Sequence, residues 1–220
     1  RAAETTKLFE NIFRSVNIGL VNEMKMICDK MNLDIHEIID AAKTKPFGYM
    51  EFRPGPGLGG HCIPIDPFLL TWKAKEYGIN TKFIELSGQI NAEMPNYVCN
   101  KIFDYFLKKK YYKKPSIVIV GISYKKNTDD IRESPSLKII EILNKSNFNV
   151  FFYDPFFSKM PSTRKYKLNN KRYDIYKNKL KKIDLVVLVT DHDNLDYNFI
   201  YKNSNHIIDT RGKFKKSKKV

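Results

Sequence analysis

Residues 116–121 read Ser-Ile-Val-Ile-Val-Gly, an unbroken apolar run rich in β-branched residues that ends at a glycine. Such a run is typical of a buried strand in a parallel sheet. A helix start follows at Ser134-Pro135, because proline favours the first helical position. Three more short apolar segments lie at residues 149–153, 184–190 and 207–209. Strands that alternate with helices predict an α/β fold, here a Rossmann-like, doubly wound parallel sheet.

The residues before this sheet have a mostly helical pattern. Apolar residues recur at spacings of three and four over residues 5–31, which predicts one long amphipathic helix capped by Thr5 or Thr6. Further helices are expected over residues 34–43, from an Asp66 cap to Gly78, over 84–91 and over 95–109. The change of pattern predicts a helical domain over residues 1–110 and a sheet domain over residues 111–220.

The composition is that of an ordinary soluble globular chain. Of its 220 residues, 42% are hydrophobic and 29% are charged, and no apolar run is long enough to cross a bilayer. No signal peptide opens the chain, and three cysteines without a C-x-x-C pair favour a reducing, cytoplasmic compartment. Because the chain begins at Arg1, already in a helical pattern and without an initiator methionine, we expect it to be a piece of a longer protein.

Lysine gives the chain a formal net charge of +15. Lysine runs are usually solvated surface, and residues 158–182 are interpreted as a polar, lysine-rich surface excursion. A basic field also favours a phosphorylated ligand. The sequence shows no zinc-finger, RNP or helix-turn-helix pattern, so no nucleic-acid partner is expected.

Residues 52–67 read Phe-Arg-Pro-Gly-Pro-Gly-Leu-Gly-Gly-His-Cys-Ile-Pro-Ile-Asp-Pro, a loop with one thiol, Cys62, and a carboxylate, Asp66, four residues later. Such a loop allows a ligand close to the backbone and can hold a nucleophile at its edge. Its Gly-x-Gly-x-x-Gly spacing over residues 55–60 matches the dinucleotide fingerprint, which requires a preceding strand and a following helix. Neither is expected here, because Ile63-Pro64 interrupts the segment that follows.

The chemistry of this loop and of the first helix leaves alternatives open. Cys62 is either a nucleophile or a buried thiol that packs beneath a tight loop. Lys7 and Asn11, four residues apart, share one helix face and either aim two donors at an oxyanion or belong to a solvated surface. His61, Cys62 and Asp66 are too few to form a recognised metal site, so no metal is expected.

A second polar cluster, residues 124–135, follows the first strand and leads into its helix. Ligands bind at the carboxyl edge of open parallel sheets, and a helix N-terminus with Lys125 and Arg132 suits a phosphate. Arg211, just past the last strand, is expected at the same edge. The other interpretation is a charged loop that merely caps a helix.

Together these motifs resemble the UDP-glucose/GDP-mannose dehydrogenase family over nearly the whole chain. The segment at residues 59–67 is similar to its catalytic cysteine motif, and Lys7-Leu-Phe-Glu-Asn11 is similar to its Lys-x-x-x-Asn pair. The motifs that resemble its nucleotide-sugar-binding domain are Gly121-Ile-Ser-Tyr-Lys125, Thr128-Asp-Asp-Ile-Arg-Glu-Ser-Pro135 and Asp209-Thr-Arg211. The cysteine segment is most similar to that of members that oxidise UDP-N-acetylhexosamines.

The resemblance implies an NAD-dependent, four-electron oxidation of a UDP-sugar at C6 to the uronic acid, in polysaccharide biosynthesis. It implies that Cys62 carries the substrate as a thiohemiacetal and then a thioester, that Asp66 serves hydrolysis, and that Lys7 and Asn11 stabilise oxyanions. The implied substrate-binding residues are Phe52, Arg53, Gly57, Gly59, Gly60, Lys125 and Arg211, and the implied NAD contact is Arg132. NAD is the implied cofactor, and a homodimer is implied through the long first helix of the central domain.

Two features depart from the family pattern. The family begins with a Rossmann NAD domain, which nothing in these 220 residues resembles, so the chain is expected to be a fragment that is inactive alone. Its glucose-oxidising members carry Lys-Asp after the cysteine, whereas Ile65 precedes Asp66 here. The rival interpretation is a nucleotide-sugar-binding module without catalysis, which would keep Lys125 and Arg211 but would not need Cys62.

Overall fold

A computed structural model describes residues 2–110, 113–217 and 219–220. The chain forms two compact units, residues 1–94 and residues 95–220. The division falls within α4 (Lys82–Lys108), whose C-terminal half packs against the sheet of the second unit through buried side chains such as Ile102 and Phe106. This division comes earlier than the expected domain boundary, and Tyr111, where the sheet domain was expected to begin, lies outside the described residues.

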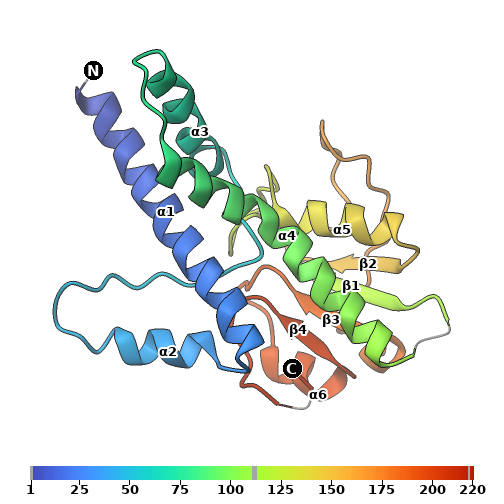
Figure 1. Ribbon diagram of the computed structural model, residues 1–220. Helices are drawn as coiled ribbons and strands as arrows, with labels where there is room; N and C mark the ends of the chain where they lie inside the picture. Colours follow the sequence, from blue (N-terminus) through green and yellow to red (C-terminus); the bar gives the residue numbers. More distant parts are fainter. Residues whose placement is uncertain (1, 111–112, 218) are drawn as a thin grey trace. The chain divides into compact units, whose positions relative to one another are not determined.

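Four parallel strands form the sheet of the second unit, in the order β2-β1-β3-β4 (Figure 1). They are β1 (Ser116–Val120), β2 (Asn149–Tyr153), β3 (Leu185–Leu188) and β4 (Ile207–Asp209). In register, Val118 of β1 pairs with Phe151 of β2 and Val186 of β3. The sheet confirms the predicted α/β, doubly wound parallel fold, and its strand order reverses between β1 and β3.

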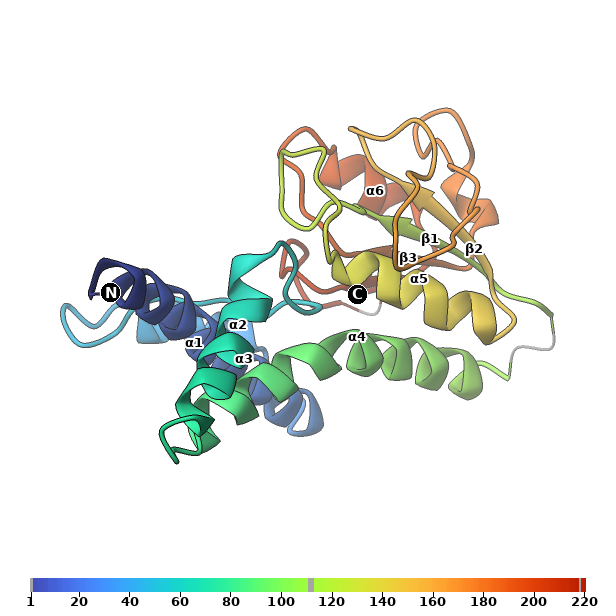
Figure 2. The same cartoon turned by 90° about the horizontal axis from the view of Figure 1, so that it is seen from above.

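Both faces of the sheet are buried. Alternate side chains of β1 point to opposite faces, and each set packs in its own core cluster. The covering elements are α5 (Pro135–Lys145), α6 (Tyr197–Asn203), the 3₁₀ turn Leu180–Lys182 and the C-terminal half of α4. Ile117 and Ile119 pack with α5 and the C-terminal half of α4, whereas Val118 and Val120 pack with the 3₁₀ turn and α6. Figure 2 shows α5 and α6 on opposite faces. Two-sided burial explains why these strands read as continuous apolar runs.

Helices make up the first unit. They are α1 (Ala2–Lys30), α2 (Ile35–Ala42), α3 (Cys62–Lys75) and the N-terminal half of α4, and a long loop over residues 43–61 joins α2 to α3 (Figure 1). α1 and α4 approach closely at Gly19, where an added Cβ would lie 3.1 Å from Ser87 Cβ. Asp34 caps α2 by accepting a hydrogen bond from the His36 amide over 2.9 Å.

Three predicted helix boundaries are wrong. α1 begins at Ala2, so Thr6 lies inside it and donates its hydroxyl to the Ala2 carbonyl. α4, predicted as two helices, runs unbroken through Pro95, because one proline removes a single backbone hydrogen bond and the turns on both sides are packed. α3 begins at Cys62 instead of at an Asp66 cap: Pro64, in its first turn, lacks an N–H that would need no intrahelical partner, and Pro67 inside the helix costs one backbone hydrogen bond. A helix therefore does follow the glycines, although no strand precedes them among the described residues.

Residues 158–182 are anchored to the sheet and are not simply a solvated excursion. Tyr166, Ile175 and Leu180 are buried, and Arg172 forms a parallel bridge to Phe152 of β2. α6 is absent from the predicted elements, because its seven residues are too few to show a helical period. None of the described helices combines the length and the apolar composition that crossing a bilayer requires.

Candidate functional site

Cys62 is the first residue of α3 and is exposed, so its thiol lies at a helix N-terminus that a ligand can reach. This exposure does not fit the alternative of a buried packing thiol. Cys28 and Cys99, by contrast, are buried. Burial raises the pKa of the Cys99 thiol to about 12, which keeps that thiol protonated and unreactive at neutral pH.

Asn11 and Asp66 connect α1 to the helix of Cys62. The Asn11 side chain is buried, and its Nδ2 donates to Asp66 Oδ2 over 2.7 Å. Asp66 lies four residues after Cys62 on α3 and so shares its helix face. Lys7 lies one turn before Asn11, but its side chain is 66% exposed and its ammonium pairs with Glu10 at 3.3 Å. The structure brings Asn11 and Asp66 into contact and leaves Lys7 in solvent.

A chain of buried amides anchors the glycine loop to α1 and α4. Asn91 Nδ2 donates to the Ser15 carbonyl over 2.9 Å, and Asn22 Nδ2 donates to Asn91 Oδ1 over 2.9 Å. Asn22 Oδ1 accepts the backbone N–H of Gly55, also over 2.9 Å. Buried polar groups need hydrogen-bond partners, and here each buried amide is the partner of the next one in the series. The series holds the start of the loop that leads to Cys62.

The glycines and Phe52 shape the turn before the thiol. Gly57 and Gly60 have φ of 124° and 80°, in the region that favours glycine. Gly59 lies between them in a partly open position. Phe52 is half-buried, and its ring meets the ring of Phe13 edge-on, with 5.9 Å between centroids. These contacts and turns constrain Phe52, Gly57 and Gly60, three of the predicted substrate-binding residues of this loop.

Arg53, another predicted substrate contact, already has acidic partners. Its Nε donates to Glu51 over 2.6 Å, and its Nη2 forms an ion pair with Asp40. Burial disfavours the charged guanidinium, but the hydrogen bonds to Asp40 and Glu51 outweigh this effect and raise the pKa of Arg53. These contacts tie the loop to α2, so a ligand that binds Arg53 would compete with two carboxylates.

Lys125 and Arg132 lie in the loop that follows β1. Lys125 is exposed, and its Nζ lies 5.5 Å from the centre of the Tyr124 ring. Arg132 is also exposed and forms a bidentate pair with Asp130, with Nε 3.0 Å from Oδ1 and Nη2 2.6 Å from Oδ2. Both basic side chains are open to solvent at the carboxyl edge of the sheet.

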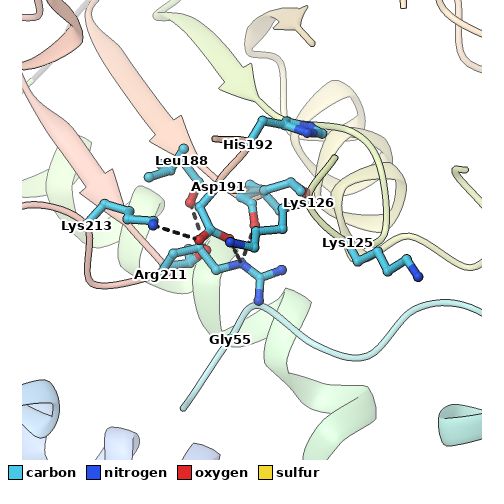
Figure 3. A network of polar contacts seen from close by, with 12 residues as sticks. Gly55, Lys125, Lys126, Leu188, Asp191, His192, Arg211 and Lys213 are labelled. Carbon is cyan, nitrogen blue, oxygen red and sulfur yellow. Dashed lines mark hydrogen bonds and ion pairs between the residues drawn. The ribbon is translucent and has the colours of Figure 1, made fainter. Parts of the chain in front are cut away.

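Arg211 follows β4 at the same edge and is largely buried. Its Nε donates to the Val189 carbonyl over 2.7 Å and lies 3.8 Å from Asp191 Oδ1. Lys213 Nζ approaches the other oxygen of Asp191 at 3.2 Å. Burial lowers the pKa of Arg211, and two nearby carboxylates oppose that effect. Figure 3 shows Arg211 and Lys213 converging on Asp191, while Lys125 extends away from this cluster.

The two predicted basic residues, Lys125 and Arg211, share an edge without touching. β3 lies between β1 and β4, so the ends of those strands are about 10 Å apart. Gly121, which directly follows β1, has φ of +86°, and a Cβ added there would lie 2.4 Å from the Thr190 carbonyl oxygen. Thr190 Oγ1 also donates to the Ser123 carbonyl over 2.6 Å. The Lys125 loop thus leaves β1 packed against the residues that follow β3.

A buried acid–imidazole pair lies beside this loop. Asp154 follows β2 and His192 follows β3, both side chains are fully buried, and Asp154 Oδ2 is 3.1 Å from His192 Nε2. Burial opposes charge on Asp154, but hydrogen bonds from His192 and from backbone amides keep its pKa below the usual value. His192 Nδ1 accepts the N–H of Asn127 over 3.0 Å.

Comparison with known proteins matches the two units to two domains of one family. The model of the UDP-glucose/GDP-mannose dehydrogenase family, central domain, matches residues 1–93, and that of the family's UDP binding domain matches residues 118–216. The chain belongs to the UDP-glucose/GDP-mannose dehydrogenase family. This confirms the resemblance seen in the sequence, and it assigns the cysteine loop to the central domain and the carboxyl edge to the UDP binding domain of that family.

Named members of the family are similar to the chain over most of its length. A UDP-N-acetyl-D-mannosamine dehydrogenase of Methanococcus vannielii is 38% identical over 87% of the chain and 41% of that protein. An NDP-N-acetyl-D-galactosaminuronic acid dehydrogenase of Ralstonia nicotianae is 34% identical over 96% of the chain and 48% of that protein. The solved UDP-N-acetyl-mannosamine dehydrogenase of Pyrococcus horikoshii has a TM-score of 0.81 and 32% identity, over 98% of the chain and 49% of that structure. The chain spans less than half the length of these relatives.

Sequence reasoning missed the polar groups that support both parts of this dehydrogenase family chain. In the central domain the missed residues are Ser15 and Asn22, which follow the nominated Asn11 at spacings of four and seven on a buried side of α1, and polar residues at core positions are a usable signal. In the UDP binding domain, Asp154 directly follows β2 and His192 lies four residues past β3, so both could have been placed at the ligand edge.

Proposed function

We propose that the protein to which this chain belongs oxidises the C6 hydroxyl of a UDP-N-acetylhexosamine to a carboxylate in two steps, with NAD as the electron acceptor. Family membership and relatives named for UDP-N-acetyl-D-mannosamine and NDP-N-acetyl-D-galactosaminuronic acid support this substrate class. The observation that carries the catalytic half is the exposed thiol of Cys62 at the N-terminus of α3, one turn from Asp66.

Cys62 acts, in this proposal, on the aldehyde that the first oxidation produces. Its thiolate adds to the carbonyl carbon, a carbon–sulfur bond forms, and the carbonyl electron pair moves to oxygen, which takes up a proton and gives a thiohemiacetal. Removal of a hydride and a proton from the thiohemiacetal leaves a thioester. Water then adds to the thioester carbon, the carbon–sulfur bond breaks, and the thiol and a carboxylic acid are released.

Three neighbouring groups assist these steps in the proposal. Asp66 positions the hydrolytic water, and its contact with Asn11 keeps the carboxylate in one orientation. The N-terminal end of α3 favours negative charge on a bound carbonyl oxygen. Lys7 exchanges its pair with Glu10 for the oxyanion, which is a favourable exchange because an exposed ion pair of this kind is weak.

The described residues do not fit an NAD site. The dinucleotide fingerprint needs a strand, a glycine-rich turn and a helix, and residues 55–60 lack a preceding strand in the described chain. After β1 the space beside Gly121 is filled by Thr190, so no cradle for a pyrophosphate remains there. We therefore place the NAD pocket in a part of the protein that the relatives have and this chain does not cover, with Arg132 reaching the cofactor from its exposed loop.

Each unit, taken by itself, supplies proposed contacts to the nucleotide sugar. Lys125 and Arg211, about 10 Å apart at the strand ends, suit an extended anion such as a nucleoside diphosphate better than a single phosphate. The Val189 carbonyl holds Arg211 at Nε and leaves its Nη groups for the ligand. From the cysteine loop, the contacts to the sugar are Phe52, Arg53, Gly57, Gly59 and Gly60.

We also propose that the protein forms a homodimer through α1. The helix exposes five large apolar side chains, Phe9, Phe13, Leu20, Met24 and Ile27, and the exposed Met31 directly follows it. Their sequence intervals of three, four and seven place most of them along one side of the helix. A contiguous apolar surface of this kind on a folded protein marks an interaction site. A second copy of α1 offers the same surface, which is the self-complementarity that a two-fold interface requires.

The decisive test is the fate of the thiol in the complete dehydrogenase. Cys62→Ser keeps the size of the side chain but removes the strong nucleophile, so uronic acid formation should fall on the order of a thousandfold or more, with UDP binding unchanged. Cys28→Ala is the matched control, because it removes a buried thiol remote from the proposed chemistry. Uronic acid formation by Cys62→Ser at the wild-type rate would refute the covalent mechanism.

The alternative is a nucleotide-sugar-binding module without catalysis. Calorimetry should show that the 220-residue chain binds UDP, and the same sample should form no NADH from NAD and a UDP-hexose. No heat at millimolar UDP from a folded sample would count against UDP binding. NADH formation by this chain alone would show that the NAD pocket lies within it. A complete protein that binds UDP but forms no NADH from NAD and a UDP-hexose would favour the module.

A further inference from the structure

Lys125 lies in a loop without regular secondary structure, yet that loop is tied down on both sides of it. The two backbone N–H groups that follow Gly121 donate to the Asp154 carboxylate. Beyond Lys125, the N–H of Asn127 donates to His192 Nδ1 over 3.0 Å. A single buried pair therefore anchors the loop before and after its exposed lysine.

The protonation of His192 follows from these contacts. A backbone N–H can only donate, so Nδ1 must be the unprotonated acceptor for Asn127. The ring therefore carries its proton on Nε2, which lies 3.1 Å from Asp154 Oδ2 and donates to it. The Phe156 ring lies against the imidazole, with 5.0 Å between centroids, and excludes water from this side. His192 is a neutral imidazole held between a carboxylate and the loop.

Asp154 is the acceptor on which the arrangement depends. Its Oδ2 accepts the N–H groups of Ile122 and Ser123 over 2.7 and 3.2 Å, besides the proton of His192. Its Oδ1 accepts the N–H of Phe156 over 2.9 Å. Every partner donates, so an ionised carboxylate satisfies them all and a neutral group of the same shape would not.

We propose that Asp154 and His192 are positioning residues for the nucleotide sugar, which hold the loop so that the Lys125 ammonium stands where the diphosphate binds. The inference rests on the proposed function, because it takes Lys125 as a ligand of the substrate. Both side chains of the pair are fully buried, so in this proposal they act through the loop and not by direct contact with the substrate. Buried partners of this kind fix the orientation of the groups that bind a ligand.

Two substitutions of His192 separate its two hydrogen bonds. Asparagine places an acceptor oxygen near the Nδ1 position and keeps the bond to the loop, whereas glutamine places a donor near the Nε2 position and keeps the bond to Asp154. We expect His192→Gln to weaken UDP binding to the 220-residue chain roughly tenfold, and His192→Asn to weaken it less than about threefold. Equal weakening by the two variants, measured by calorimetry, would overturn the proposal.

A double-mutant cycle shows whether His192 acts through Lys125. In a Lys125→Ala background, His192→Gln should weaken UDP binding by less than about twofold further, because the group that it positions is already gone. A full additional tenfold loss would assign His192 a general structural role and overturn the inference. Lys145→Ala removes a positive charge at the far end of α5 and is the matched control, with UDP affinity expected within about twofold of wild type.

A measurement on the unsubstituted chain does not depend on whether variants fold. Nitrogen NMR of His192 should show a proton on Nε2 and none on Nδ1 at neutral pH, and a proton on Nδ1 would overturn the inference. A wild-type chain that does not bind UDP would overturn both the proposed function and this inference. UDP binding that Lys125→Ala weakens and His192→Gln leaves unchanged would overturn the inference alone.

Discussion

The Asn11 amide donates a 2.7 Å hydrogen bond to the Asp66 carboxylate, which joins α1 to the helix that begins at Cys62. The contact links two residues that the sequence motifs nominate separately. It also commits one of the two amide protons of Asn11 and leaves the other for a second acceptor. Asn11 therefore has a structural role that exists before any substrate binds, whatever its part in stabilising an oxyanion.

Removal of this contact should destabilise the first unit. Asn11→Ala leaves the half-buried Asp66 carboxylate without its donor, so we expect a loss of about 1–3 kcal/mol in unfolding free energy. Urea unfolding followed by the fluorescence of Trp72, which lies on α3, is the measurement. Asn17→Ala is the control on the same helix, because the Asn17 side chain donates to a carbonyl one turn earlier on α1 itself, and its effect should stay within about 0.5 kcal/mol. Equal effects of the two substitutions would contradict this account.

The three thiols should differ sharply in reactivity. Cys62 is exposed, whereas Cys28 and Cys99 are buried, and burial raises the pKa of Cys99 to about 12. With limiting iodoacetamide at about pH 8, we expect Cys62 to be alkylated at least roughly tenfold faster than the other two. Peptide mass spectrometry over time gives the three rates, and denatured protein, in which all three should react alike, is the control. Faster alkylation of Cys28 in the folded chain would refute the placement of Cys62.

Asp154 should make stability depend on acidity. Its hydrogen bonds hold the pKa of Asp154 in the folded state below the usual value. The ionised carboxylate therefore contributes to the free energy of unfolding above an unfolded-state pKa of about 3.9, and this contribution is lost as pH falls through the folded-state pKa. We expect Asp154→Asn to cost about 1–3 kcal/mol at pH 7 and to show a shallower loss of stability below about pH 4 than wild type. Chemical unfolding between pH 7 and pH 3 measures both. Asp104→Asn, an exposed site on α4, should keep the wild-type slope.

The apolar surface of α1 should govern self-association. Leu20 and Ile27, two turns apart on α1, are 56% and 46% exposed. Leu20→Glu together with Ile27→Lys places charges on this surface, so we expect a dimer to become a monomer in light scattering at micromolar concentration. Glu23→Gln changes a residue between them and should leave the dimer intact. A wild-type chain that remains monomeric at high concentration would contradict the proposed interface.

Local sequence pattern was sufficient to predict the bounds of elements whose residues all have the same kind of surroundings, such as strands buried on both faces. The bounds of β1, β2 and β4 agree with the predicted segments, because strands buried on both faces need continuous apolar runs. The start of α5 at Pro135 agrees too, because proline suits a first helical turn. The motifs also pointed to the correct family, because the cysteine segment at residues 59–67 and the basic residues after β1 and β4 are particular residue types at particular spacings.

Local sequence pattern did not predict helix bounds correctly where packing against neighbouring elements overrides the local preference of a residue such as proline. α4 continues through Pro95, and α3 begins at Cys62, because packing of the adjoining turns outweighs the loss of one backbone hydrogen bond. Arg53 is a further case, since the family resemblance implied it as a substrate contact and the structure pairs it with Asp40 and Glu51.

The sequence by itself determined the parallel sheet and the helical character of the first unit, and it nominated Cys62 as the candidate nucleophile. Only the tertiary structure decided that Asn11 meets Asp66, 55 residues away, and that Asp154 meets His192, 38 residues away. The physical reason is that periodicity and turn chemistry act over a few residues, whereas a buried hydrogen bond between distant residues depends on how whole helices and strands pack. Residue types specify what chemistry is available, and packing specifies which groups are near enough to use it.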